Sequence, residues 1–454
     1  MKELSVYNVF TPSSPATECF VERTNLNRRL VDALKTPGKQ IVLFGHSGSG
    51  KSTLLINKLN QTYEGYIITR CTSDISFDKL LLDAFDQFGQ FITSEQNSKV
   101  SSTKSFGLSS TQDYLAIKNV INSNLNISKT SEENIKQVPI VPFQLTPQKL
   151  ARFFGEKKFC WVIEDFHKIQ ENEKLRLSHL MKVFVDESIT SPEAKIIVLG
   201  AVGSSKEVIQ NDAELNNRLV TINVPLMDEV ELIKIIEKGE GLLNIKIHEN
   251  VKNKIAHFSS GLASVAHQLC LTLCTNNAIY SNNHKIKTLD LDDFKSSLEC
   301  YLENNSENLK VKFEKAISVA IQKSNSLSKE VLKCFLVSKK NSMTKDDIVK
   351  VLKQLKIQYH IEILEEKLLD LSDKGTLNIL EYNADNDSYM FNDPFFKVYC
   401  YCNIEIDEIK KTNQLHLFNI NETESNSKKK QKEEKLKNLK FISFVLQNWT
   451  EIDF

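Results

Sequence analysis

The sequence has no long hydrophobic run and no excess of charge of either sign. Its longest apolar stretches, such as residues 196–202, are far shorter than the ~20 residues that a membrane-spanning helix needs. Lys and Arg number 58 and Asp and Glu number 58, so the formal net charge is zero. That balance excludes a general electrostatic attraction to nucleic acid or to an anionic membrane, and leaves only local basic patches for such contacts. A composition of 41% hydrophobic and 26% charged residues excludes collagenous and wholly disordered classes.

Cysteine is sparse and scattered. There are nine cysteines, an odd number, and the N-terminus has no apolar core of the signal-peptide type. We therefore expect a cytoplasmic protein with free, mostly core-filling thiols rather than a disulfide scaffold. His267, Cys270 and Cys274 lie at helical spacing, but a structural zinc needs four ligands and no fourth is evident. We interpret them as a buried helix face, and Cys400 and Cys402 as packing residues.

Short runs rich in Ile and Val alternate with helical patterns in the first half of the chain. The candidate strands are residues 41–44, 66–71, 159–163, 196–200 and 220–224. Continuous apolar runs are typical of parallel strands that are buried on both faces. Alternation with helices predicts an α/β fold, a three-layer parallel-sheet domain.

Four parts follow from these patterns and from the length of 454 residues. Residues 1–225 form the α/β domain, with a mobile Ser- and Asn-rich insertion at about 93–147. Residues 226–305 read as helical throughout and form a helical lid. Residues 306–402 show four helical patterns and then two apolar runs around a turn, at 377–380 and 389–391, which is the order of a winged helix. Residues 403–454 form a Lys-rich tail with a short terminal helix at 441–449.

The strongest motif fits G-x-x-x-x-G-K-[ST] in full. It consists of Gly45, His46, Ser47, Gly48, Ser49, Gly50, Lys51 and Ser52, followed by Thr53. A predicted strand precedes it and a helical run follows, which is the context of a phosphate-binding P-loop. Backbone N–H groups of the loop and of the following helix would face phosphate oxygens. Lys51 would reach the β- and γ-phosphates, and Ser52 would ligate Mg²⁺.

The strand at 159–163 ends in two acids, Glu164 and Asp165. A P-loop site needs a carboxylate at the end of a neighbouring strand to organise Mg²⁺. Because side chains alternate at a strand end, the two acids take different roles. We assign Glu164 to Mg²⁺, through water, and Asp165 to the attacking water. The usual order is Asp then Glu, and Asp165 is one methylene shorter than the usual Glu, so we expect slow hydrolysis.

These motifs together resemble the P-loop AAA+ and STAND-type ATPases. The chain is most similar to archaeal and bacterial ATPases related to replication initiators and transposition regulators. Besides the P-loop and the strand end at 163–167, the resemblance covers an N-terminal adenine-side motif at 20–23, the run 217–222 and the winged-helix end at 389–399. The residues alone do not distinguish ATP from GTP, so ATP is implied by the resemblance only. The resemblance also implies a homo-oligomer.

The resemblance also implies that Arg218 is an arginine finger for the site of a neighbouring subunit. The alternative from the residues is a surface Arg that caps a helix C-terminus. Two differences from the motifs of this family argue against fast ATP hydrolysis. The strand at 196–200 leads into Gly-Ala-Val-Gly, where a polar sensor is usual, and residues 261–264 contain no sensor arginine.

The segment before the predicted wing, residues 360–374, holds five acids and two lysines. Such a face would repel duplex DNA, so we interpret the winged helix as a protein-docking module. We therefore expect an ATP-binding switch that controls a protein partner through the winged helix or the insertion, and no membrane contact. Two alternatives remain: a DNA-engaging initiator or transposition-type ATPase, and a non-catalytic scaffold stabilised by bound nucleotide.

Overall fold

The computed structural model describes residues 3–87, 146–200, 215, 217–282, 285–304, 307–318, 327–338, 340–375, 377–384 and 386–421. The chain divides into two compact units. The α/β unit comprises Tyr7–Leu242 and Gly261–His267, and the helical unit comprises Met1–Val6, Leu243–Ser260 and Gln268–Phe454. The predicted insertion, apart from Thr146 and Pro147, and the predicted terminal helix lie outside the described residues.

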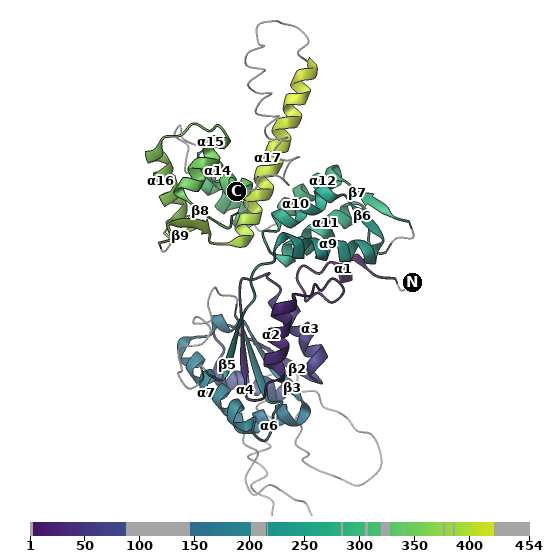
Figure 1. Cartoon of the computed structure of the whole chain (residues 1–454), viewed down its shortest axis with the longest axis vertical. Helices are drawn as coiled ribbons and strands as arrows, with labels where there is room; N and C mark the ends of the chain where they lie inside the picture. The colour runs from purple at the N-terminus through teal and green to yellow at the C-terminus, as the bar shows by residue number, and fades with distance from the viewer. Residues whose placement is uncertain are drawn as a thin grey trace, which may run out of the picture. The chain divides into compact units, whose positions relative to one another are not determined.

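The α/β unit is built around a five-stranded sheet (Figure 1). Its strands are β1 (Gln40–Phe44), β2 (Gly65–Arg70), β3 (Phe159–Glu164), β4 (Lys195–Gly200) and β5 (Leu219–Asn223). Its helices are α2 (Thr24–Lys35), α3 (Lys51–Thr62), α4 (Phe77–Gln87), α6 (Pro147–Lys157), η1 (Phe166–Lys168) and α7 (Glu171–Glu187). In three further helices the chain passes from one unit to the other: α1 (Val6–Val9), α9 (Glu229–Leu243) and α11 (Ala263–Asn276).

All neighbouring strands of this sheet are parallel, in the order β2-β3-β4-β1-β5. The sequence therefore predicts the α/β class correctly, because each of the five expected apolar runs forms one of these strands. Successive side chains of each strand enter different cores. Ile41 and Leu43 pack with α2 and α3, whereas Val42 packs with the core of α4, α6 and α7. The unit thus has three layers, with helices on both faces of the sheet.

The helical unit contains two small sheets. Its strands are β6 (Ile245–Ile247), β7 (Lys287–Leu289), β8 (Ser342–Thr344), β9 (Leu380–Asn383) and β10 (Ser388–Phe391). Its helices are α10 (Glu249–Phe258), α12 (Leu291–Glu303), α13 (Glu307–Ser318), α14 (Leu327–Val337), α15 (Lys345–Gln354), α16 (Ile361–Ser372) and α17 (Pro394–Asn421). Strands β6 and β7 pair in parallel, and β8, β10 and β9 form an antiparallel sheet in that order.

Three features of the helical unit differ from the sequence predictions. The segment expected to be helical throughout contains β6 and β7, which have only three residues each. The first strand of the ribbon begins at Leu380 instead of at residue 377, because Asn378 adopts a left-handed conformation and Ile379 donates a backbone hydrogen bond to Leu371. Helix α17 runs on through the boundary expected at 402.

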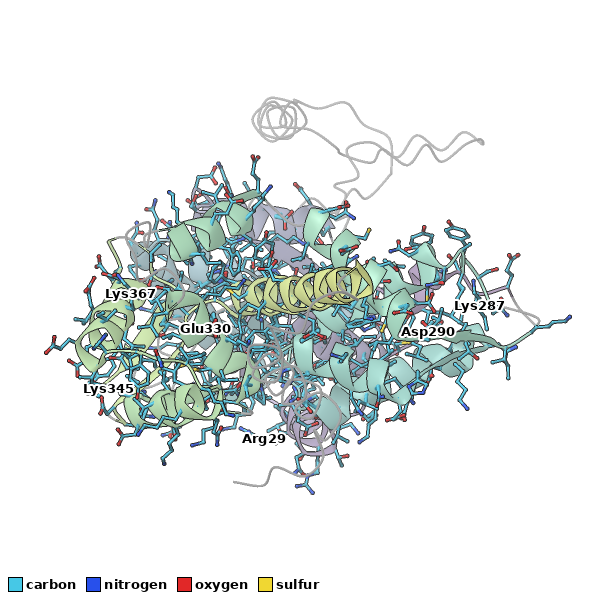
Figure 2. The ribbon with its side chains drawn as sticks, turned by 90° about the horizontal axis from the view of Figure 1, so that it is seen from above. Arg29, Lys287, Asp290, Glu330, Lys345 and Lys367 are labelled. Atoms are coloured by element: carbon cyan, nitrogen blue, oxygen red, sulfur yellow. The ribbon has the colours of Figure 1, made fainter. Side chains whose placement is uncertain are left out.

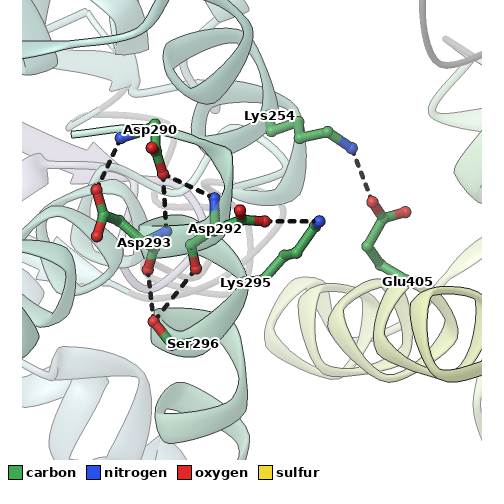
Figure 3. Close-up of polar contacts among 7 residues, drawn as sticks. All are labelled: Lys254, Asp290, Asp292, Asp293, Lys295, Ser296 and Glu405. Carbon is green, nitrogen blue, oxygen red and sulfur yellow. Dashed lines mark hydrogen bonds and ion pairs between the residues drawn. The ribbon is translucent and has the colours of Figure 1, made fainter. Parts of the chain in front are cut away.

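Ion pairs and helix caps join the elements of the helical unit. Lys345 at the start of α15 pairs with Glu365 of α16 at 2.7 Å. Lys367 is buried on α16. Figure 2 labels both lysines. Figure 3 shows the capping box in which Asp290 accepts from the backbone of α12, and the 2.7 Å pair between Lys254 of α10 and Glu405 of α17. In the part of the chain that the structure describes, no helix is long and apolar enough to cross a membrane.

Candidate nucleotide site

The predicted P-loop connects β1 to α3 and requires glycine at two points. Gly45 has φ +146°, and a Cβ added there would lie 2.3 Å from the backbone oxygen of Val224. Gly50 has φ +91° and occupies the N-cap position of α3, which begins at Lys51. Both conformations favour glycine, so the backbone follows a tight path into the helix. The loop therefore ends at a helix N-terminus, where free N–H groups and the helix dipole attract anions.

The Lys51 side chain folds back over the loop. Its Nζ donates to the backbone oxygens of Gly45 at 2.8 Å and of His46 at 2.7 Å. Burial lowers the pKa of Lys51 to about 8, although Asp165 and Glu164 act in the opposite direction. The ammonium group thus lies at the mouth of the loop, held by two carbonyl groups that a phosphate oxygen would replace.

Glu164 and Ser52 meet at the end of β3. Ser52 Oγ donates to Glu164 Oε1 at 3.1 Å. The other carboxylate oxygen, Oε2, lies 3.3 Å from Nε of Arg70, whose side chain is 76% exposed. Hydroxyl and carboxylate oxygens are the ligands that Mg²⁺ prefers. The structure therefore brings together the two residues that the sequence assigns to the metal, and their donor set fits that ion.

Asp165 has a partner outside this pair. It follows β3 with φ +58° and precedes η1, and its Oδ2 accepts from Lys168 Nζ at 2.6 Å. Its side chain is 43% exposed. Asp165 still lines the same cavity as the P-loop. The two acids thus have different partners, Ser52 and Arg70 for Glu164 and Lys168 for Asp165.

A cavity of about 400 Å³ extends from the P-loop between the strand ends and the N-terminal segment of the unit. Residues 11–16 and 19–21 form one wall, together with Met227 and Ile235. The N-terminal part of α11 contributes Ala263, Ser264 and His267 to the lining. The N-terminal part of the lining mixes apolar residues such as Pro12, Pro15 and Val21 with polar ones, and Arg23 lines the cavity as well. Lys51, Glu164 and Asp165 add charged groups from the P-loop and the end of β3.

The start of α11 is fixed by another glycine. Gly261 has φ +83°, and an added Cβ would lie 2.6 Å from Cβ of Leu226. Its carbonyl accepts from the backbone of Met227 at 2.9 Å. This contact holds the segment 261–264 against the cavity. This segment contains no arginine. Ala263 and Ser264 are its residues that line the cavity.

Arg218 does not line this cavity. It precedes β5, and its backbone oxygen accepts from Gln40 at the start of β1, whereas the P-loop follows the end of β1. A five-residue strand spans roughly 17 Å, so Arg218 lies at the opposite edge of the sheet from its own P-loop. Its NH1 group lies 3.1 Å from Oδ1 of Asp186, and both side chains are exposed.

Two residues that line the cavity were not expected there from the sequence. Arg70 ends β2 beside Glu164, a position that the strand-end rule used for Glu164 could have found. His267 was interpreted from the sequence as part of a buried helix face, and it also lines the cavity. His267, Cys270 and Cys274 are all buried. Within the described ranges, no group of three or more His, Cys, Asp or Glu residues is placed to hold a metal ion.

A comparison with protein-family models finds no match, and neither does a comparison with curated protein sequences. Solved structures do match. A Walker-type ATPase of Pyrococcus abyssi is 15% identical, with 84% of this chain and 96% of that chain covered and a TM-score of 0.45. The ORC2 protein of Aeropyrum pernix is 11% identical (89% and 98% covered, TM-score 0.46). Cdc6p of Pyrobaculum aerophilum is 14% identical (88% and 98% covered, TM-score 0.38).

Proposed function

We propose that this chain binds ATP with Mg²⁺ at the cavity beside residues 45–52 and hydrolyses it slowly, as a molecular switch. The observation that carries the proposal is the 3.1 Å contact between Ser52 Oγ and Glu164 Oε1 at the N-terminus of α3. It supports a phosphate site with its own cation-binding oxygens. ATP, as opposed to GTP, is proposed from the resemblance.

Each group at the P-loop and the end of β3 has a distinct task. The N–H groups of the loop and of α3 bind phosphate oxygens. Lys51 exchanges its contacts with Gly45 and His46 for the β- and γ-phosphates. Ser52 and Glu164 would hold Mg²⁺, which when bound neutralises charge on the β- and γ-phosphates.

Asp165 is proposed to position the attacking water. The water oxygen bonds to the γ-phosphorus, the bond from that phosphorus to the β–γ bridging oxygen breaks, and Asp165 accepts the water's proton. Lys168 holds this carboxylate at 2.6 Å, so Asp165 must exchange a cation for the water. This competition and the short side chain support slow turnover.

Arg218 is proposed to act on a second copy of the chain. It lies at the edge of the sheet opposite its own P-loop and is half-exposed, so only the site of another subunit is open to it. A guanidinium group there would stabilise charge on the γ-phosphate during transfer. This role requires a homo-oligomer whose subunits place one P-loop against the next Arg218.

The sheet β8-β10-β9 with α14, α15 and α16 is proposed to be a winged helix that docks a protein partner. Helix α16 exposes Ile361 and Leu369 to solvent, and Glu362, Glu365 and Glu366 are exposed beside them. Acidic and apolar side chains on the helix before the wing favour a protein over duplex DNA. The DNA-engaging alternative would need basic groups elsewhere, and the Lys run at 428–435 lies outside the described residues.

The test is ATP hydrolysis measured against protein concentration, with and without duplex DNA. Lys51→Ala and Arg218→Ala are the control variants. Rates per subunit that rise with concentration and collapse in both variants support composite sites in an assembled ATPase. Stimulation by DNA, with a steep salt dependence, would favour the initiator-type alternative. Tight nucleotide binding without turnover, abolished by Lys51→Ala, would remove the role of Arg218 and favour the scaffold.

A further inference from the structure

The solvent-facing side of α16 combines apolar and acidic residues. Ile361, Glu365 and Leu369 follow one another at intervals of four, so they lie on one face of the helix. Ile361 and Leu369 are 48% and 68% exposed. The exposed charged residues of α16 are Glu362, Glu365 and Glu366. This face therefore offers exposed hydrocarbon beside negative charge.

The hairpin of β9 and β10 continues this face with two tyrosines. Tyr382 and Tyr389 lie opposite each other with ring centroids 5.1 Å apart, and Tyr382 is 47% exposed. Lys345 follows β8, which pairs with β10, and its Nζ lies 2.7 Å from Glu365 Oε1. Burial raises the pKa of Tyr389, and the carboxylates of Asp387 and Glu365 add to this rise. The tyrosines thus lie beside the acidic face of α16.

We call these residues together the α16–hairpin surface: Ile361, Glu362, Glu365, Glu366, Leu369, Tyr382 and Tyr389. Exposed apolar side chains that gather among charged ones mark a place where another segment binds. The charge and the hydrocarbon of this surface complement a segment that is basic and apolar.

The chain itself contains such a segment. Residues 428–440 hold seven lysines and two glutamates. The next stretch, residues 441–449, is mostly apolar and includes Phe441, Phe444 and Trp449. Both parts lie outside the described residues, and both match the α16–hairpin surface in chemistry.

This segment is long enough to reach the surface in the same chain. Helix α17 begins at Pro394, shortly after β10, and runs to Asn421. Its 28 residues span about 42 Å. The chain between residues 421 and 441 spans up to roughly 66 Å when extended. Because this exceeds the length of α17, the apolar stretch can return to the hairpin at which α17 begins.

We propose that residues 428–449 bind the α16–hairpin surface of their own chain. The lysines pair with the acids of α16, and the apolar residues of 441–449 pack on Ile361, Leu369 and Tyr382. This contact goes beyond the proposed function. Because the same surface is proposed for a protein partner, the segment excludes that partner until it is displaced.

Trp449 reports on this contact. The chain has two tryptophans, and the other, Trp161, is buried in the core of the α/β unit. Subtracting the emission of Trp449→Phe from that of the full-length protein leaves the spectrum of Trp449. We expect emission at short wavelength and protection from acrylamide, because the indole is covered by the α16–hairpin surface.

Substitutions on α16 test where the indole binds, each made with and without Trp449→Phe. Ile361→Ser combined with Leu369→Ser should shift the Trp449 emission to longer wavelength and increase its quenching. Glu362→Lys should act in the same direction, and so should ~1 M NaCl, at which the screening length is ~3 Å. Leu175→Ser is the matched control. Leu175 is a 46% exposed apolar residue of α7 in the other unit, so its loss should change neither property.

Two results would overturn the inference. One is a Trp449 that is freely quenched in the full-length protein, or whose protection survives both sets of α16 substitutions. The other is protection that disappears on dilution, because it would assign the contact to a second copy of the chain. The measurement uses neither nucleotide nor partner, so its failure leaves the proposed ATP site and the proposed partner docking standing.

Discussion

The hydroxyl of Ser52 lies 3.1 Å from Oε1 of Glu164, although 112 positions separate the two residues. Parallel strands bring them together, because the P-loop follows β1 and Glu164 ends β3, and both strand ends open at one edge of the sheet. Helix α3 then directs the Ser52 side chain toward the neighbouring carboxylate. The pair defines where a divalent cation would sit beside the loop.

Glu164→Gln should lower the Mg²⁺-dependent part of ATP affinity about 10- to 100-fold, because a carboxylate that holds a cation through water is replaced by a neutral amide. Calorimetry with Mg²⁺ and with EDTA measures that part directly. Glu187→Gln is the matched control, since Glu187 pairs with Arg152 and does not line the cavity. Equal affinities for Glu164→Gln and the unsubstituted protein in Mg²⁺ would exclude Glu164 from the metal site.

Gly45→Ala should destabilise the α/β unit by roughly 2 kcal/mol or more, since the new Cβ would lie 2.3 Å from the Val224 oxygen in a strained conformation. Gly241 provides the opposite case. It lies on α9, and a Cβ there meets nothing within 4 Å. Gly241→Ala should therefore stabilise by about 0.5–1 kcal/mol. Urea unfolding of both variants checks the signs, and a Gly45→Ala protein as stable as the original would contradict the described loop.

The five strands of the main sheet were predictable because both of their faces are buried. A run such as residues 196–200 is apolar throughout, and every residue of β4 is buried. The P-loop was predictable because its glycines, lysine and serine are contiguous. In contrast, β6, β7 and β8 have three residues each, too few for an alternation to stand out.

Residues whose part in the site depends on tertiary contacts were harder to find. His267 was tested only against Cys270 and Cys274 on its own helix, whereas its hydrogen-bond partner is Thr11, 256 positions away. The order of the ribbon was predictable, but the position of its first strand was not. Asn378 turns the chain there, and Asn is one of the few residues that adopt a left-handed conformation readily.

Because of Lys195, the stability of the α/β unit should rise with pH in the alkaline range. Its Nζ is buried and donates at 2.8 Å to the backbone oxygens of Ala33 and Thr36, at the end of α2. Burial lowers the pKa of Lys195 from 10.5 to about 8. Between these values the unfolded chain binds the proton and the folded chain has released it, so stability rises with pH.

The comparison is with Lys195→Met, which has no titrating group at this position. The unsubstituted protein should gain stability relative to Lys195→Met as the pH rises from 8 to 10.5. Lys51 also titrates with a lowered pKa, but it is present in both proteins and cancels in the difference. Urea unfolding at half-unit pH steps measures the two curves. Parallel curves would mean that Lys195 keeps its ordinary pKa in the folded protein.

Asp186→Asn should make Arg218 more available to a second subunit. The two side chains lie 3.1 Å apart, and with 51% and 70% of their surfaces exposed, their pairing is worth ~0.2–1 kcal/mol. If Arg218 must leave Asp186 to reach a neighbouring site, the substitution shifts assembly-dependent ATP hydrolysis to protein concentrations up to about fivefold lower. The measurement is the rate per subunit across a dilution series.

Arg218→Ala combined with Asp186→Asn separates this competition from a general change of surface charge. The double variant should be as inactive as Arg218→Ala alone, because Asp186 then has no arginine to release. Glu187→Gln, one position along the same helix, should leave the concentration dependence where it is, since its partner is Arg152. If Asp186→Asn raised the rate equally with and without Arg218, the ion pair would have no part in controlling the site, and the effect would come from repulsion between subunits.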